Sequence, residues 1–358
     1  FGWVAVAVGF GGAFVLAIVY YYFRVHYSYY GRLSLGLTTT FVIPLAFFLG
    51  ALVGVGRFLE AGLAAIACVY LLVEKKELRE LGESMTKQEL LDLLVFIVIA
   101  FIIYPNLPAG EVRVLWLGFN VQYFWLIVVV VSAISFAGHV LAKYYRDKAV
   151  FYTAFLGGLV SSLATTVLFL KKTRDKRVVF SAVVCAALAS TISNAGVVLI
   201  ANPFFFERVL PLALALSALY AATAWFSVKK LRGETDAVKV ERHALSLRFA
   251  IEFAFVFFFV SLVLANLATN PASAVTFAFF SGLVSSTSVW AAAAYAFGAG
   301  ALPLRAALLA VAFASIGSLA AKTTLASLAV KNTGLRVRLA ALLVLALAAS
   351  VATAVLSS

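Results

Sequence analysis

Apolar residues fill most of the chain in long runs that short polar stretches interrupt. Runs of about 20 residues match the ~30 Å hydrocarbon core of a bilayer, which a helix of that length crosses. None of the runs shows the alternation that is typical of a membrane β-barrel. The pattern therefore predicts an all-α polytopic membrane protein. Its twelve apolar runs are 1–23, 35–55, 58–73, 90–106, 123–142, 149–170, 178–201, 208–228, 248–268, 273–297, 302–328 and 338–357.

A five-residue motif, GLVSS, occurs twice inside these runs. It begins at Gly158 and again at Gly282, 124 positions later. Both copies are rich in Gly, Ser and Thr, and duplicated interruptions of this kind are where transporter folds place their binding site. We therefore divide the chain into N-terminal membrane helices over 1–110, a first repeat over 123–228, a polar linker over 229–247 and a second repeat over 248–357.

Lys and Arg residues gather in the loops between the runs. If all twelve runs cross the membrane, the basic loops on either side of 149–170 lie on opposite faces. If that run and 273–297 each enter and leave by one face, nearly all basic loops share a face, as the positive-inside rule requires. The charges thus favour about ten transmembrane helices with two re-entrant hairpins over twelve full spans. The loops predicted to be cytoplasmic are 74–89, 143–148, 171–177, 229–248 and 331–338.

Each repeat then contains three spans and one hairpin. Because three is odd, the repeats have opposite orientations, and the hairpins meet near the middle of the membrane. Hydrocarbon cannot form hydrogen bonds with the unpaired backbone N–H and C=O groups at the hairpin tips. These groups favour an anion where helix N-termini face the site and a cation where carbonyl oxygens face it. The sequence leaves both signs open. The residues predicted to bind the solute are Gly158, Ser161, Ser162, Thr165, Gly282, Ser285, Ser286 and Asn194.

Each of these residues also has a structural interpretation. Small residues serve close helix packing in membranes, which is the alternative for both GLVSS copies. Asn194 either lines the pathway beside the first hairpin or only bonds to a neighbouring helix. Lys322 and Glu252 lie inside apolar runs, where a charge is costly. They either form a structural ion pair or act as gating or coupling groups.

Composition excludes several classes of function. The net charge is +13, but charged residues make up only 12% of the chain and lie mostly in loops, which indicates membrane topology rather than nucleic-acid binding. Cys68 and Cys185 have no metal or redox spacing. The sequence has no G-x-S-x-G, phosphate-loop or H-E-x-x-H motif, which argues against an enzyme, and it calls for no cofactor. The repeats hold too few carboxylates for a buried Mg²⁺ or Ca²⁺ cage.

Several motifs resemble a known family. Residues 36–40, GLTTT, and the run that ends at 48–51 resemble the second part of MgtC/SapB-type membrane proteins. The segments 134–138, 156–166, 171–174 and 281–286 resemble the uncharacterised C-terminal domain fused to them. The Gly-rich start and the Arg-Thr pair of the family are not found, which predicts that an N-terminal segment precedes Phe1. The resemblance implies Mg²⁺ transport or the regulation of transport, and it supplies no ligand residues.

These features together predict a transporter or channel for a small inorganic ion in a prokaryotic plasma membrane. The ion would bind at mid-membrane between the two GLVSS hairpins. The alternative is a non-transporting membrane regulator of ion homeostasis, and a further rival is a membrane enzyme that acts on lipid. The expected partners are the ion and the lipid bilayer, with no nucleic acid. Whether the chain forms a homo-oligomer is left open.

Overall fold

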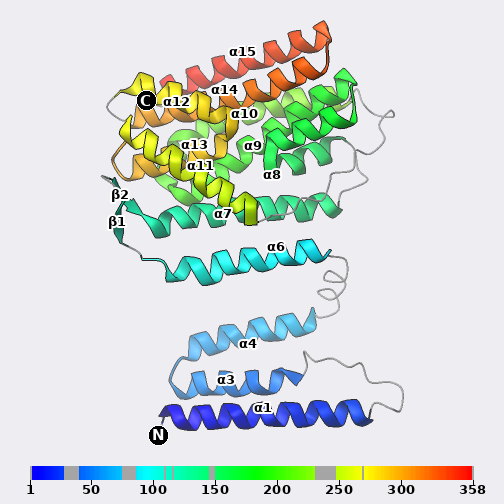
Figure 1. The fold of residues 1–358 in the computed structure, drawn as a ribbon, viewed down its shortest axis with the longest axis vertical. Helices are drawn as coiled ribbons and strands as arrows, with labels where there is room; N and C mark the ends of the chain where they lie inside the picture. Colours follow the sequence, from blue (N-terminus) through cyan, green and yellow to red (C-terminus); the bar gives the residue numbers. More distant parts are fainter. Residues whose placement is uncertain are drawn as a thin grey trace. The chain divides into compact units, whose positions relative to one another are not determined.

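The computed structural model describes residues 2–27, 40–74, 86–108, 110–114, 117–144, 150–229, 247–267 and 270–356. The chain forms two compact units, Phe1–Thr86 and Lys87–Ser358. Eight of the described helices are long and apolar enough to cross a membrane. The prediction of an all-α polytopic membrane protein is therefore confirmed (Figure 1).

The smaller unit contains three apolar helices, α1 (Gly2–Tyr27), α3 (Val42–Gly54) and α4 (Phe58–Val73). Helix α1 packs closely on α3 at Gly9, where an added Cβ would lie 2.3 Å from the Phe47 ring. Large apolar side chains such as Leu16 and Leu59 are exposed on these helices. A contiguous exposed apolar surface is typical of contact with lipid.

The larger unit begins with α6 (Lys87–Ile97), which continues through a π-helical turn and a short 3₁₀ turn. This helix ends at Asn106, where the apolar run 90–106 also ends. The other long helices of the unit are α7 (Val121–Tyr144), α8 (Val150–Lys172), α9 (Lys176–Ala201), α10 (Pro203–Lys229), α11 (Leu247–Asn266), α12 (Pro271–Val284), α13 (Ser286–Gly298), α14 (Leu304–Ala329) and α15 (Thr333–Leu356).

One feature of this unit was not predicted. Between α6 and α7, β1 (Glu111–Val114) pairs antiparallel with β2 (Leu117–Asn120). Strands of four residues are at the lower limit for a recognisable period-two pattern, so this small sheet was not predicted from the sequence. The segment 74–89, predicted to be a cytoplasmic loop, lies mostly outside the described residues.

Helix α8 folds back on itself. Its backbone is extended at Ser161, with φ −159° and ψ 108°. A Cβ on Gly157 would lie 2.8 Å from Thr165 Oγ1, although residues eight apart in a straight helix are separated by about 12 Å along the axis. Residues 150–172 therefore form a first hairpin with its tip at Ser161.

Helices α12 and α13 form a second hairpin with its tip at Ser285, where φ is −152° and ψ is 102°. Helix α12 runs inward along α14, because Gly282 contacts Ala314 and Ser285 shares a cavity wall with Ser318. Helix α13 then returns along α9, with Ser286 bonded to Asn194 near its start and Ala294 bonded to Asn202 near its end.

The hairpins enter the larger unit from opposite ends. Arg177 at the start of α9 and Arg338 near the start of α15 line one surface pocket, so both lie at a common basic end. The first hairpin connects to α9 at this end through Thr173–Asp175. The second hairpin finishes at the other end, where Asn202 follows α9. The predicted pair of re-entrant hairpins in an inverted repeat is therefore the arrangement in the structure (Figure 1).

Candidate functional site

Both hairpins break at a serine that caps the helix following it. Ser161 Oγ accepts a hydrogen bond from the Ala164 N–H at 3.3 Å, and Ser285 Oγ accepts one from the Ser288 N–H at 3.2 Å. A capping serine satisfies one of the N–H groups that the start of a helix leaves open. The duplicated motif thus places an equivalent helix break, with an equivalent cap, at each tip.

The next serine in each copy is bonded crosswise between the repeats. Lys322 on α14 donates from Nζ to Ser162 Oγ at 3.0 Å. Asn194 on α9 donates from Nδ2 to Ser286 Oγ at 3.2 Å and accepts from Thr287 Oγ1 at 2.7 Å. Asn194 and Lys322 are each the 19th residue of a 26-residue helix, counted from Lys176 and from Leu304. Asn194 therefore bonds to the tip of the second hairpin, and each long helix has one polar side chain that bonds to the hairpin tip of the other repeat.

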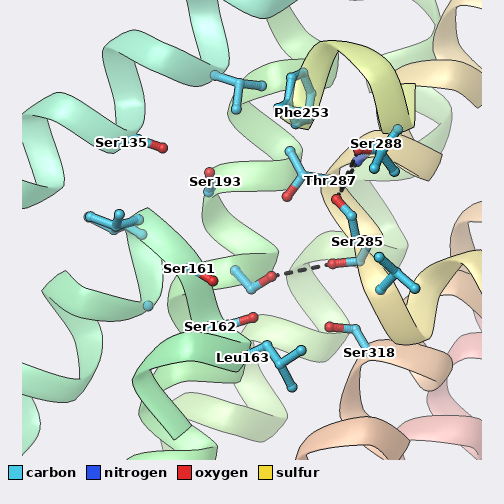
Figure 2. A pocket seen from close by; sticks show the side chains of 18 of the residues that line it. Ser135, Ser161, Ser162, Leu163, Ser193, Phe253, Ser285, Thr287, Ser288 and Ser318 are labelled. Carbon is cyan, nitrogen blue, oxygen red and sulfur yellow. Dashed lines mark hydrogen bonds between the residues drawn. The ribbon is translucent and has the colours of Figure 1, made fainter. Parts of the chain in front are cut away.

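A cavity of about 200 Å³ lies between the two tips. One water molecule occupies about 30 Å³ of liquid, so this space has room for a few waters or a partly hydrated small ion. Figure 2 shows Ser161 and Ser162 on one side of the cavity and Ser285 and Ser318 on the other. Its hydroxyl-bearing walls are Ser135, Ser161, Ser162, Ser190, Ser193, Ser285, Ser286, Thr287, Ser288 and Ser318.

Lys322 borders a second, much smaller space of about 10 Å³. Ser190, Ser286 and Ser318 line both spaces, so the two are neighbours. The other polar residues that line the smaller one are Thr191, Asn194, Tyr220 and Ser315. The Lys322 side chain is only 2% exposed. A buried lysine side chain therefore lies beside the cavity between the tips.

Glu252 is placed differently from Lys322. It lies on α11, is exposed, and contributes to the wall of the larger cavity. Among the residues that the structure describes, no ion pair joins Glu252 to Lys322, whose ammonium contacts Ser162 instead. The interpretation of these two charges as a structural ion pair therefore does not hold.

Three of the predicted site residues serve packing. A Cβ on Gly158 would lie 2.8 Å from Ala186 Cα, and one on Gly282 would lie 2.3 Å from the Ala314 carbonyl oxygen. Gly158 also borders the cavity, whereas Gly282 and Thr165 are not among its lining residues. Thr165 packs against Gly157 inside the first hairpin.

Four further residues of the two cavities were not predicted from the sequence. Ser135 on α7, Phe253 on α11 and Ser318 on α14 line the cavity, and Tyr220 on α10 lines the smaller space. Each lies within an apolar helix and outside the duplicated motif. For Ser135, Ser318 and Tyr220 the hydroxyl was the only available signal, and Phe253 has no polar group. A single hydroxyl in such a helix does not show which way the helix faces.

Comparison with known families identifies one match. A family model described as a domain of unknown function (DUF4010) matches residues 129–330. The matched region begins in α7 and ends just after α14, so it includes both hairpins and the long helices bonded to their tips. No curated protein and no solved structure matches the chain.

Proposed function

The chain belongs to the DUF4010 family, and from that premise we propose that it moves a small inorganic ion across a membrane, as a transporter or channel. The observation that carries this proposal is the meeting of two interrupted helices at one polar cavity inside an apolar helical bundle. Open backbone groups and hydroxyls are what proteins use to replace the hydration shell of an ion.

The cavity hydroxyls support this function over packing alone. Close helix packing explains the presence of Gly158 and Gly282. Packing does not explain Ser135 and Ser193, which line the cavity and are 2% and 9% exposed. Neither serine makes a hydrogen bond to any other described residue. Polar groups inside a membrane protein are costly and usually functional, so an ion pathway accounts for them.

The opposite entry of the hairpins suggests how access would alternate. The first hairpin reaches the cavity from the basic end, and the second reaches it from the other end. A shift of one hairpin while the other stays closed would open the cavity to one side only, as in transporters with inverted repeats. We place the basic end in the cytoplasm of a prokaryotic cell, following the positive-inside rule.

The resemblance to MgtC/SapB-type proteins remains a proposal for the N-terminal part. Its motif at 36–40 lies almost wholly outside the described residues. The family match covers 129–330 and therefore the segments that resemble the uncharacterised C-terminal domain. Transport is consequently proposed for the larger unit, where the cavity lies.

The proposal is tested by filling the cavity from both tips. The variant Ser162→Leu/Ser286→Leu adds apolar bulk on two walls of the cavity. In liposomes containing the purified full chain, we expect the ion flux to fall by about tenfold or more, which corresponds to about 1.4 kcal/mol on the barrier. Fluxes of Na⁺, K⁺, Mg²⁺, chloride, nitrate, sulfate and phosphate are each measured.

Thr276→Leu is the matched control. Thr276 lies on the second hairpin, and its exposed hydroxyl donates a hydrogen bond to the Ala272 carbonyl oxygen of the same helix. This control is expected to keep its flux. Undiminished flux in the folded double variant would show that the ion does not pass between the tips. Well-folded wild-type protein that moves none of these ions would favour the non-transporting regulator.

A further inference from the structure

Lys322 forms no ion pair with any residue that the structure describes. The side chain is 2% exposed, and its ammonium can donate three hydrogen bonds. Within the described ranges, Ser162 Oγ is the partner to which it donates, and no carboxylate pairs with it. A buried cation in a membrane protein is costly unless an anion compensates it. The site is therefore one negative charge short.

The helix ends do not supply that charge. At each tip one half-helix ends and another begins, so partial negative and partial positive charges lie side by side and largely cancel. Ser162 is the first residue after the break at Ser161, which places Lys322 at the positive start of the second half-helix. The Lys322 side chain therefore adds its positive charge at the tip of the first hairpin.

The internal repeat shows that this charge is not required to hold a hairpin. At the equivalent position of the first repeat, neutral Asn194 bonds to Ser286. An uncharged side chain is thus sufficient to anchor a tip. The cation at position 322 needs another explanation, and compensation by a bound ion provides one.

A second donor points into the same space. Tyr220 lines the small cavity beside Lys322, is 2% exposed, and makes no hydrogen bond to another residue in the described part of the chain. A buried phenol normally finds a partner. Together with Lys322 and the hydroxyl of Ser286, it forms a set of donors that suits an acceptor-rich ligand.

We propose that the transported solute is a small inorganic anion, held between Lys322 Nζ and the hairpin tips at Ser162 and Ser286. This inference rests on the proposed function of ion transport. The anion would neutralise the ammonium and accept from the hydroxyl groups around it. Glu252, exposed on α11, lines the larger cavity and is not among the residues that line the smaller space around Lys322.

Anion binding is measured on the purified full chain in detergent by thermal unfolding. Sodium chloride, nitrate, sulfate and phosphate are each titrated against sodium gluconate at equal ionic strength, and potassium and magnesium gluconate form the cation series. A ligand that binds the folded state raises the unfolding temperature in a saturable way. We expect this response for at least one of the four anions and for neither cation.

Substitutions at Lys322 connect the response to the site. Lys322→Met is expected to weaken the apparent affinity for that anion by about 10- to 100-fold, the effect of losing one charged hydrogen bond. Lys322→Arg keeps the charge and is expected to keep the response. Lys331→Met, an exposed lysine just after the same helix, is the matched control and should bind as wild type. If Lys322→Met does not fold, Lys322→Gln, which imitates Asn194, has the same expected result.

The possible outcomes separate this inference from the proposed function. Stabilisation by a cation alone, an anion response that survives in Lys322→Met, or no Lys322-dependent response to any of the four anions overturns the anion assignment. Cation flux that is lost in Ser162→Leu/Ser286→Leu also overturns it and leaves ion transport standing. Lys322-dependent anion binding without flux of any ion would support the anion-binding site and contradict the proposed transport function.

Discussion

Replacing Gly282 by alanine should force the second hairpin away from α14. An added Cβ would lie 2.3 Å from the Ala314 carbonyl oxygen and 2.6 Å from Ala314 Cα. Gly317 faces the same arm of the hairpin, and its added Cβ would lie 2.2 Å from the Phe279 carbonyl oxygen. All these atoms belong to the backbone, so no side chain can rotate away. The two helices must separate by about 1 Å to restore ordinary contact, which weakens the dispersion attraction along the interface.

The size of the effect follows from a matched pair of variants. Overpacking of a tight contact costs about 1–3 kcal/mol. Alanine gains about 1 kcal/mol over glycine in a helix, and Gly282→Ala and Gly196→Ala share that gain. At Gly196 on α9 the added Cβ would lie 3.8 Å from Ile134 Cδ1, an ordinary contact. Gly282→Ala is therefore expected to be less stable than Gly196→Ala by about 1–3 kcal/mol.

Thermal unfolding of the purified variants in one detergent, at one scan rate, measures this difference. Each kcal/mol shifts the unfolding temperature by roughly 2–4 °C for a domain of about 150–250 residues. A fixed scan rate is needed because unfolding of membrane proteins is often irreversible. If Gly282→Ala unfolds at the same temperature as Gly196→Ala or higher, the close contact between α12 and α14 is not present in the folded protein.

Two further predictions concern the hairpin tips. Ser285→Ala removes the cap of α13 and is expected to destabilise the protein by about 1 kcal/mol in the same unfolding assay. Ser285→Asn can also cap the helix and is expected to stay close to wild type. Equal losses of stability in both variants would show that capping is not the cause. The Oγ atoms of Ser190 and Ser286 are 3.4 Å apart, so Ser190→Cys/Ser286→Cys, in a background where Cys68 and Cys185 are replaced by alanine, is expected to form a disulfide on oxidation. After cleavage at a protease site inserted in the linker 229–247, the two halves should stay joined on a non-reducing denaturing gel, and their separation would contradict the contact between α9 and the second tip.

The architecture of the larger unit follows from the sequence alone to a large extent. The length of the apolar runs determines that they are helices, because a bilayer of fixed thickness requires helices of about 20 residues. The duplicated GLVSS motif and the basic loops predict hairpins that enter from opposite ends. The structure confirms this arrangement with extended backbone at Ser161 and Ser285, positions 124 residues apart.

The sequence identified the two glycines of the repeated motif, and the tertiary structure determined what they do. The sequence marked Gly158 and Gly282 as special, but it did not distinguish solute binding from packing. The answer depends on the neighbouring backbone, which belongs to α9 at Gly158 and to α14 at Gly282. Contacts of this kind are set when helices pack, and no local pattern contains them.

The sequence by itself therefore determined the membrane character of the protein, its helices and its antiparallel duplication, since each depends on run length, local repeats or the charge of loops. Only the tertiary structure decided which side chains surround the cavity. Lys322 and Ser162 are 160 positions apart in the chain, and Ser135 and Tyr220 lie in helices with few polar residues. Helices that are apolar on all sides have no polar face to show their rotation, so the partners of each buried polar group are settled only when the helices pack.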